Sequence, residues 1–304
     1  MPGLSESCAS GHDFRAFLLQ LQNIQELSLV IGNFRLSPAT FNFSPIRFPN
    51  LEYLGASVTS SSIFSWFETP LLVEVWLFCE KSRSHHGSTS TEEISSLIDR
   101  SSCRIRYLSL QCCCDEAARK IIKTLSSVED FDTEERGLLS HLVRDIANAK
   151  EYIYLPKMRV FEVKSCPRRF IEVIENLYRL LEARGKESGI APSSRNFVPL
   201  ERLMIRVDWV ECDCCSVFFA LTCNNGRRCF DRALLDMFSW PSFSVTDVRS
   251  DKSNDGSITM KARALAAGTQ IELTFYYPEG LGNSIYGNER YHRILEHSLL
   301  QELQ

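Results

Sequence analysis

The sequence lacks the features that would direct a chain into a membrane or into the secretory pathway. Its most apolar stretch, residues 63–79, is interrupted by Glu68 and Glu74, whereas a membrane-spanning helix needs about 20 mostly apolar residues. The first residues contain no basic segment followed by an apolar run, which is the mark of a secretory signal. We therefore expect a cytoplasmic or nuclear protein that has no membrane partner.

The sequence also has little excess charge of either sign. Its 34 Lys and Arg residues are balanced by 38 Asp and Glu residues, which gives a formal net charge of −4. This balance creates no long-range field that would attract nucleic acid. Hydrophobic residues make up 44% of the 304 residues, as in ordinary folded proteins, and this length suits one large domain or two smaller ones.

Signatures of catalysis are absent as well. The sequence contains no GxSxG, HExxH or GxxxxGK[ST] motif, and no local motif marks any of its cysteines as a nucleophile. A Cys–His pair that meets only in the folded chain remains open. We expect no catalytic residue, no enzyme activity and no cofactor.

Cysteine is not scarce, since the chain has twelve cysteines, gathered chiefly at residues 112–114 and 212–229. In the cytosol or nucleus these are expected to be reduced thiols. An alternative interpretation is a zinc-stabilised cysteine-rich binding domain. In that domain four cysteines would bind the zinc ion: Cys212, Cys214, Cys223 and Cys229. Their spacing matches no common zinc finger, and free cysteine is often simply buried, so we expect no metal site.

A short pattern recurs along the first two thirds of the chain: apolar, two residues, apolar, one residue, apolar. Copies occur at Ile24-Leu27-Leu29, Leu51-Leu54-Ala56, Leu72-Val75-Leu77, Ile105-Leu108-Leu110, Met158-Phe161-Val163 and Leu200-Leu203-Ile205, and a weaker copy at Val128-Phe131-Thr133. Their central residues lie 21 to 42 positions apart. A leucine-rich repeat has the form LxxLxLxxN/C and a period of about 20–29 residues. In two copies, Cys113 and Cys166 occupy the place of the final N/C position of this form.

The segments between the copies have the apolar spacing of amphipathic helices. We predict helices at residues 90–98, 115–125 and 167–185, and a further one over residues 133–146 with Thr133 as its N-cap. Beyond residue 210 the pattern fades into strands at 258–265 and 269–277, and helices at 230–238 and 291–303.

The predicted fold is α/β, an irregular leucine-rich-repeat solenoid with parallel strands lining a concave face and helices on the convex face. Residues 1–20 are a lead-in, residues 21–210 form the solenoid, and residues 211–304 form an α+β cap over its end. The alternative is a set of ordinary amphipathic strands separated by helices.

Several segments together resemble the leucine-rich-repeat region of the F-box proteins expanded in mushroom-forming fungi. They are FPNLEYLGAS (48–57), TPLLVEVWLF (69–78), ISSLIDRSSCRIRYLSLQCC (94–113), IIKTLSSVEDFD (121–132) and LPKMRVFEVKSC (155–166). The resemblance implies substrate recognition for a ubiquitin ligase. The F-box that docks the Skp adaptor in that family is not recognisable here, because the first repeat begins by Ile24. A Skp adaptor is therefore an expected partner only where an F-box lies upstream.

Residues between the buried apolar positions of such strands point to the concave face, where we expect an unknown protein partner to bind. The candidate protein-binding residues are Tyr53, Trp76, Phe78, Tyr107, Arg202, Met204 and Arg206. The aromatic candidates come first along the chain, and the last three form a basic end. An acidic strip of Asp130, Asp132 and Glu134 precedes the basic end, and Glu162 and Lys164 come between the two. Aromatic and Arg side chains are where interface energy concentrates. The aromatics would alternatively pack beneath loops or the cap.

Overall fold

The computed structural model describes residues 11–29, 44–57, 64–78, 90–111, 115–134, 143–146, 154–165, 167–185, 197–208, 240, 243–252 and 258–277. The chain divides into two compact units, Met1–Ser127 and Val128–Gln304. Both units are mixed α/β with mostly parallel strands, which confirms the α/β part of the predicted fold class. The predicted boundaries at residues 20 and 210 remain predictions. None of the described helices combines the length and the apolar character needed to cross a bilayer.

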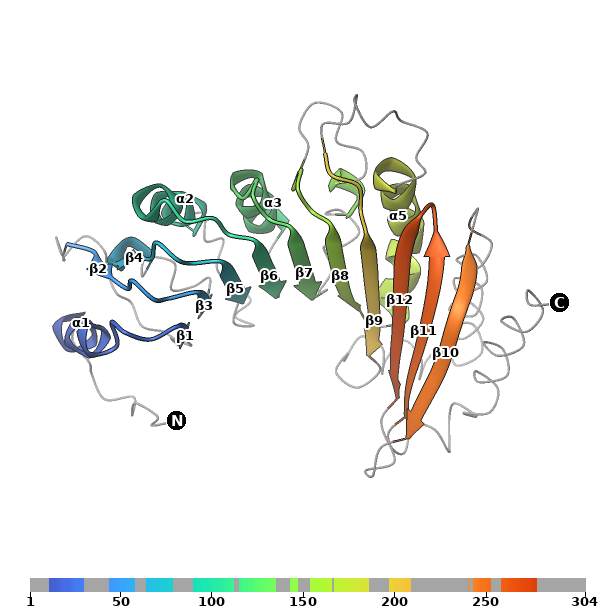
Figure 1. Ribbon diagram of the computed structural model, residues 1–304, viewed down its shortest axis with the longest axis horizontal. Helices are drawn as coiled ribbons and strands as arrows, with labels where there is room; N and C mark the ends of the chain where they lie inside the picture. Colours follow the sequence, from blue (N-terminus) through green and yellow to red (C-terminus); the bar gives the residue numbers. More distant parts are fainter. Residues whose placement is uncertain are drawn as a thin grey trace. The chain divides into compact units, whose positions relative to one another are not determined.

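The first unit contains a parallel sheet whose strands follow one another in chain order (Figure 1). Its strands are β1 (Glu26–Leu29), β3 (Tyr53–Ser57), β5 (Glu74–Phe78) and β6 (Tyr107–Gln111). The central residues of the repeated pattern are register partners across this sheet, in the order Leu27, Leu54, Val75 and Leu108. All four are buried, so the predicted anchors form one continuous apolar row.

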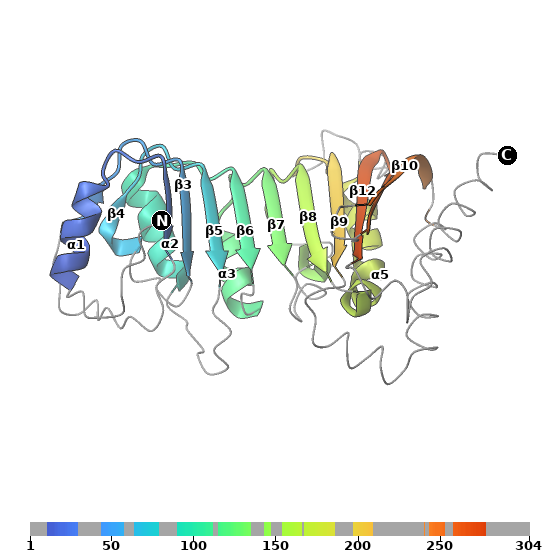
Figure 2. The ribbon, with the colours of Figure 1, turned by 90° about the horizontal axis from the view of Figure 1, so that it is seen from below.

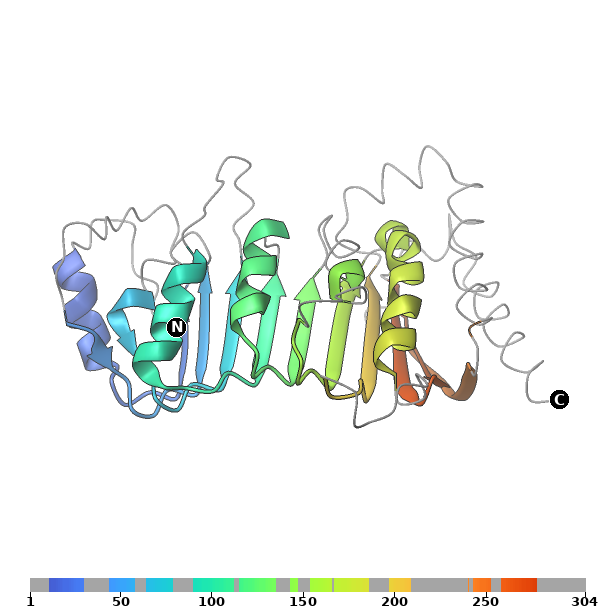
Figure 3. The same ribbon diagram turned by 90° about the horizontal axis from the view of Figure 1, so that it is seen from above.

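Helices and a small second sheet cover one face of this parallel sheet (Figure 3). The covering elements are α1 (Gly11–Gln20), α2 (Ser90–Ser101), α3 (Asp115–Thr124) and the pair β2 (Ile46–Arg47) with β4 (Phe67–Glu68). Arg100, in the last turn of α2, donates hydrogen bonds to the carbonyls of Phe64 and Phe67 at 2.8–2.9 Å. This guanidinium therefore fixes the end of α2 to the segment that carries β4.

The second unit contains β7 (Asp130–Glu134), β8 (Val160–Ser165) and β9 (Arg202–Asp208), which are parallel. β12 (Thr269–Tyr277) continues this sheet as a parallel neighbour of β9, and β11 (Ile258–Ala266) and β10 (Ser244–Lys252) follow it antiparallel (Figure 2). The buried row here runs through Phe131, Phe161, Leu203 and Ile271. Ala267 and Gly268 join β11 to β12 with φ of 48° and 71°, as a tight hairpin turn requires.

The same hydrogen-bond arrangement recurs at the start of successive strands. In the first unit, the N–H groups of Glu52 and Tyr53 both donate to the carbonyl of Gln25, at 2.8 and 3.1 Å. The carbonyls of Glu52 and Val73 each accept two N–H groups from the next strand in the same way. In the second unit, the carbonyls of Glu129 and Arg159 do so. We call this arrangement the shared-carbonyl contact; it fixes β3, β5, β6, β8 and β9 each to the strand before it at one defined residue.

The C-terminal end of α5 (Pro167–Arg184) is fixed by a buried arginine and a tightly enclosed glycine. Arg184 is 2% exposed and donates to the carbonyls of Tyr154 and Leu155, at 3.3 and 2.8 Å. Burial lowers the pKa of this guanidinium to about 10. A Cβ added at Gly185 would lie 2.5 Å from the carbonyl oxygen of Leu181 and 2.7 Å from that of Ala267, so only glycine fits where the helix meets the β11–β12 turn.

Most of the predicted elements within the described residues are confirmed, and the start of one predicted helix is wrong. The predicted helices at 90–98, 115–125 and 167–185 correspond to α2, α3 and α5, and the two predicted C-terminal strands to β11 and β12. Thr133 does not cap a helix, because it is a buried residue of β7 paired with Val163. Of the later part of that segment the structure describes residues 143–146, which are helical. A β-branched side chain suits this strand position.

Other predicted elements lie outside the described residues, and some observed elements were not predicted. The segments 230–238 and 291–303 lie outside, as do Cys113 and Cys166. Neither β10 nor the small sheet of β2 and β4 was predicted from the sequence. Residues 1–20 were predicted to be a lead-in, and the structure places α1 within them.

The buried row of the second unit predicts a large effect of truncating Phe161. This side chain is fully buried and stacks on Phe131, with ring centroids 5.4 Å apart. We expect Phe161→Ala to lower the free energy of unfolding by about 3–5 kcal/mol, because it removes apolar contacts and leaves a cavity. The measurement is urea denaturation. Leu265→Ala is the control, since Leu265 is 45% exposed in the same unit; equal losses in the two variants would contradict a continuous core at Phe161.

Candidate functional site

In each unit, the strands present a second face that carries no helix among the residues that the structure describes (Figures 2 and 3). We call it the open face. Side chains alternate along a strand, so the residues on the open face are those between the buried anchors. All seven predicted binding residues lie at such positions, four in the first unit and three in the second.

Three rings on the open face of the first unit form an aromatic row: Tyr53, Trp76 and Tyr107, from β3, β5 and β6. The centroid of the Trp76 ring lies 5.9 Å from that of Tyr53, with a tilt of 60°, and 5.9 Å from that of Tyr107, with the planes only 27° apart. All three side chains are partly exposed. Phe78 shares this face, two residues beyond Trp76 on β5, and is also partly exposed. The prediction that these aromatics lie together is confirmed for the three rings.

A glycine makes room for the first ring of the row. A Cβ added at Gly55 would lie 3.0 Å from the hydroxyl oxygen of Tyr53 and 3.1 Å from Oγ of Ser28. The Tyr53 side chain therefore extends along the strand over Gly55, where a larger residue would crowd it. The sequence interpretation did not assign this role to Gly55.

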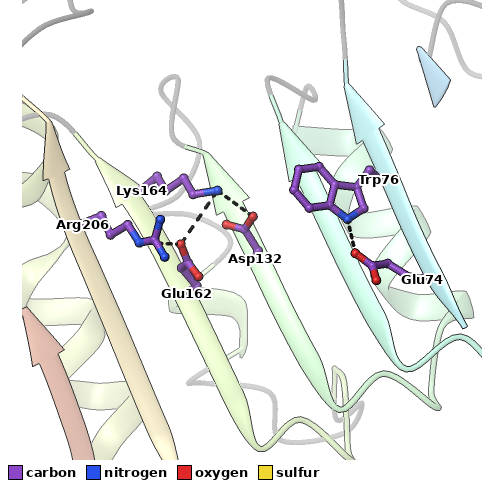
Figure 4. Close-up of polar contacts among 6 residues, drawn as sticks. All are labelled: Glu74, Trp76, Asp132, Glu162, Lys164 and Arg206. Carbon is purple, nitrogen blue, oxygen red and sulfur yellow. Dashed lines mark hydrogen bonds and ion pairs between the residues drawn. The ribbon is translucent and has the colours of Figure 1, made fainter. Parts of the chain in front are cut away.

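Two carboxylates accompany the aromatic row. Glu74 is the register partner of both Tyr53 and Tyr107, and its Oε1 accepts a 2.7 Å hydrogen bond from Nε1 of Trp76 (Figure 4). Glu26 is the register partner of Tyr53 on β1. Burial and then these two carboxylates raise the pKa of the Tyr53 hydroxyl above its ordinary value. The aromatic row is thus a set of partly exposed rings with the carboxylates of Glu74 and Glu26 beside them.

The open face of the second unit carries an ionic cluster of four residues: Asp132, Glu162, Lys164 and Arg206, from β7, β8 and β9 (Figure 4). Nζ of Lys164 lies 2.9 Å from Oδ2 of Asp132 and 3.8 Å from Oε1 of Glu162. Nε of Arg206 lies 2.9 Å from the same oxygen of Glu162. The cluster therefore joins the predicted acidic strip to the predicted basic end.

The acids of the ionic cluster are much less exposed than its bases. The side chain of Asp132 is 1% exposed and that of Glu162 is 11% exposed, whereas that of Arg206 is 54% exposed. Burial, and secondarily the Asp132 carboxylate, raises the pKa of Glu162, while Arg206 and Lys164 act in the opposite direction. The direction of this shift means that desolvation and repulsion exceed the attraction of the two cations.

The other two predicted residues of the basic end also lie on β9. Arg202 is exposed and is the register partner of Val160 and Gln270. Met204 is partly exposed between its partners Glu162 and Glu272. Asp130 is partly exposed at the start of β7. The side chain of Glu134, at its end, lies outside the described residues.

Glu74 and Glu26 are the site residues that sequence reasoning missed. Both occupy the same alternate positions as the predicted aromatics, so the alternation of buried Leu and Val with exposed residues was the available signal. What the sequence alone did not provide was the register that places Glu74 opposite two tyrosines.

Among the residues of the described ranges, no group of three or more His, Cys, Asp or Glu side chains is arranged to hold a metal ion. The cysteines of the zinc alternative, Cys212, Cys214, Cys223 and Cys229, lie outside those ranges. No protein-family model matches this chain, and no curated protein matches it.

The raised pKa of Glu162 predicts how stability depends on pH. A carboxyl whose pKa is raised by folding binds its proton more tightly in the folded state, so its stabilising contribution is present below its ordinary pKa and is lost as pH rises through the raised pKa. We expect Glu162→Gln to gain stability relative to the original protein as pH rises through that range, because the variant never ionises there. Urea denaturation between pH 4 and 8 measures the difference.

The matched control is Glu175→Gln. Glu175 is on α5 in the same unit, its side chain is 74% exposed, and its partner is Arg179. A difference between Glu162→Gln and the original protein that is flat with pH, or that matches the control, would contradict the desolvated state of Glu162.

Proposed function

We propose that this chain is a non-enzymatic protein–protein interaction module that binds its partner with the open face of its strands. The observation that carries the proposal is the aromatic row, in which Tyr53, Trp76 and Tyr107 lie side by side and partly exposed on adjacent strands. Aromatic side chains dominate binding energy at protein interfaces because each buries a large area with few rotatable bonds.

Within this proposal, the fold is a short, irregular leucine-rich-repeat solenoid whose concave face is the open face. Two observations support it: the in-register anchors within each unit, and the shared-carbonyl contact at the start of successive strands. The anchors recur along the strands of each unit and the contact recurs at the starts of β3, β5, β6, β8 and β9, as expected of stacked units that bury their apolar sides against each other.

The resemblance to fungal F-box proteins with leucine-rich repeats gives the proposal its biological setting. The module would be the substrate-recognition part of an F-box-type ubiquitin-ligase receptor. Binding of a Skp adaptor would require an F-box in the same polypeptide, and no described residue is assigned to it. A cytoplasmic or nuclear location would suit a chain with twelve cysteines and a buried free thiol at Cys103.

A pull-down with the purified chain tests the module. We expect Trp76→Ala and Tyr107→Ala each to weaken retention of a bound partner about tenfold or more, the size expected for a ring at the centre of an interface. Quantitative mass spectrometry of the retained proteins at several bait concentrations measures the change.

Leu19→Ala controls for the loss of an apolar side chain elsewhere. Leu19 lies on α1 of the same unit and is 44% exposed. Circular dichroism and thermal unfolding establish that each variant keeps its fold. If both ring variants retain every partner as well as the original chain does, binding through the aromatic row is wrong.

A further inference from the structure

The open face of the first unit has a one-sided charge. Its described strand residues are acidic, aromatic or neutral, with no Lys or Arg among them: Glu26, Ser28, Tyr53, Gly55, Glu74, Trp76, Phe78, Tyr107, Ser109 and Gln111. The chain as a whole has nearly as many basic as acidic residues, so this face is a local exception. A partner group that is positively charged would find no competing cation at these strand positions.

The arrangement of rings and carboxylates suits a cationic side chain. The face of an aromatic ring is electrically negative, and Lys and Arg side chains bind over it, with Trp giving the strongest attraction. Trp76 lies between two tyrosines, with each ring centroid 5.9 Å from its neighbour. The Glu74 carboxylate accepts the indole N–H, which holds the ring and the negative charge next to each other.

The same features disfavour an anionic partner. Proteins that bind single-stranded nucleic acid also use rows of aromatic rings, but they pair the rings with a basic groove that follows the phosphates. Here Glu26 and Glu74 occupy the register positions beside Tyr53 instead. Phosphates would be repelled at the point where the bases stack.

We infer that the aromatic row, with Glu74 and Glu26, binds Lys or Arg side chains of a basic peptide segment in the partner protein. This inference rests on the proposed function, because it names the chemistry of the partner that the open face would bind. Raising the salt concentration weakens such binding, since the carboxylates are near the surface and their field is screened.

The test uses the full chain and three labelled peptides of equal length, in which serine alternates with arginine, with citrulline or with glutamate. Citrulline keeps the shape and polarity of arginine but has no charge. Fluorescence anisotropy gives the dissociation constants. We expect the arginine peptide to bind about tenfold or more tightly than the citrulline peptide, and the glutamate peptide to bind least.

Two substitutions connect that preference to the site. Trp76→Phe keeps a ring but weakens its attraction for a cation, and we expect it to reduce arginine-peptide affinity severalfold. Glu74→Gln removes one charge while its amide oxygen still accepts the indole N–H, and we expect a loss of about threefold. Asp99→Asn is the matched control, because Asp99 is an exposed carboxylate on α2 of the same unit. We expect this variant to bind the arginine peptide with unchanged affinity.

The outcomes separate this inference from the proposed function. Equal affinity for the arginine and citrulline peptides overturns the inference, as does an equal loss in Glu74→Gln and Asp99→Asn. Preferential binding of the glutamate peptide or of a single-stranded oligonucleotide also overturns it. If these results occur while Trp76→Ala still weakens partner retention as expected above, the interaction module stands and only the basic partner is wrong.

Discussion

The register between neighbouring parallel strands is the constraint on which the rest of this structure depends. The carbonyls of Gln25, Glu52, Val73, Glu129 and Arg159 each accept two N–H groups at the start of the following strand, and this fixes which residue pairs with which. Once the register is fixed, Leu27, Leu54, Val75 and Leu108 must form one buried row in the first unit. Because side chains alternate along a strand, a slip of one residue would exchange that row with the open face.

The two units use the open face in different ways. In the first unit, partly exposed rings lie beside carboxylates, which leaves a surface with unbalanced charge and accessible apolar area. In the second unit, opposite charges on neighbouring strands pair with each other. The charges of the ionic cluster therefore pair with one another, whereas the rings of the aromatic row contact one another and are partly exposed. For this reason we propose the aromatic row, rather than the ionic cluster, as the binding surface.

The strand anchors could be predicted from the sequence because each is a large apolar residue within a repeated pattern of three apolar positions. The sequence predicted α5 equally well, since Pro167 and Gly185 mark its start and end. The helix N-cap predicted at Thr133 was wrong because Thr followed by Glu also begins many helices. Only the pairing with β8 shows that Thr133 belongs to β7. The candidate aromatics were predicted as a set, but their contacts with Glu74 depend on register. The buried state of Glu162 likewise depends on neighbours from β7 and β9 that no local pattern reveals.

The shared-carbonyl contact has a consequence for how this chain tolerates changes in length. It ties the beginnings of β3, β5, β6, β8 and β9 to the strand before each of them, and the connections between strands are not part of this contact. The spacing between anchors already varies from 21 to 42 residues. Insertions and deletions can therefore accumulate in those connections while the geometry of the aromatic row stays constant.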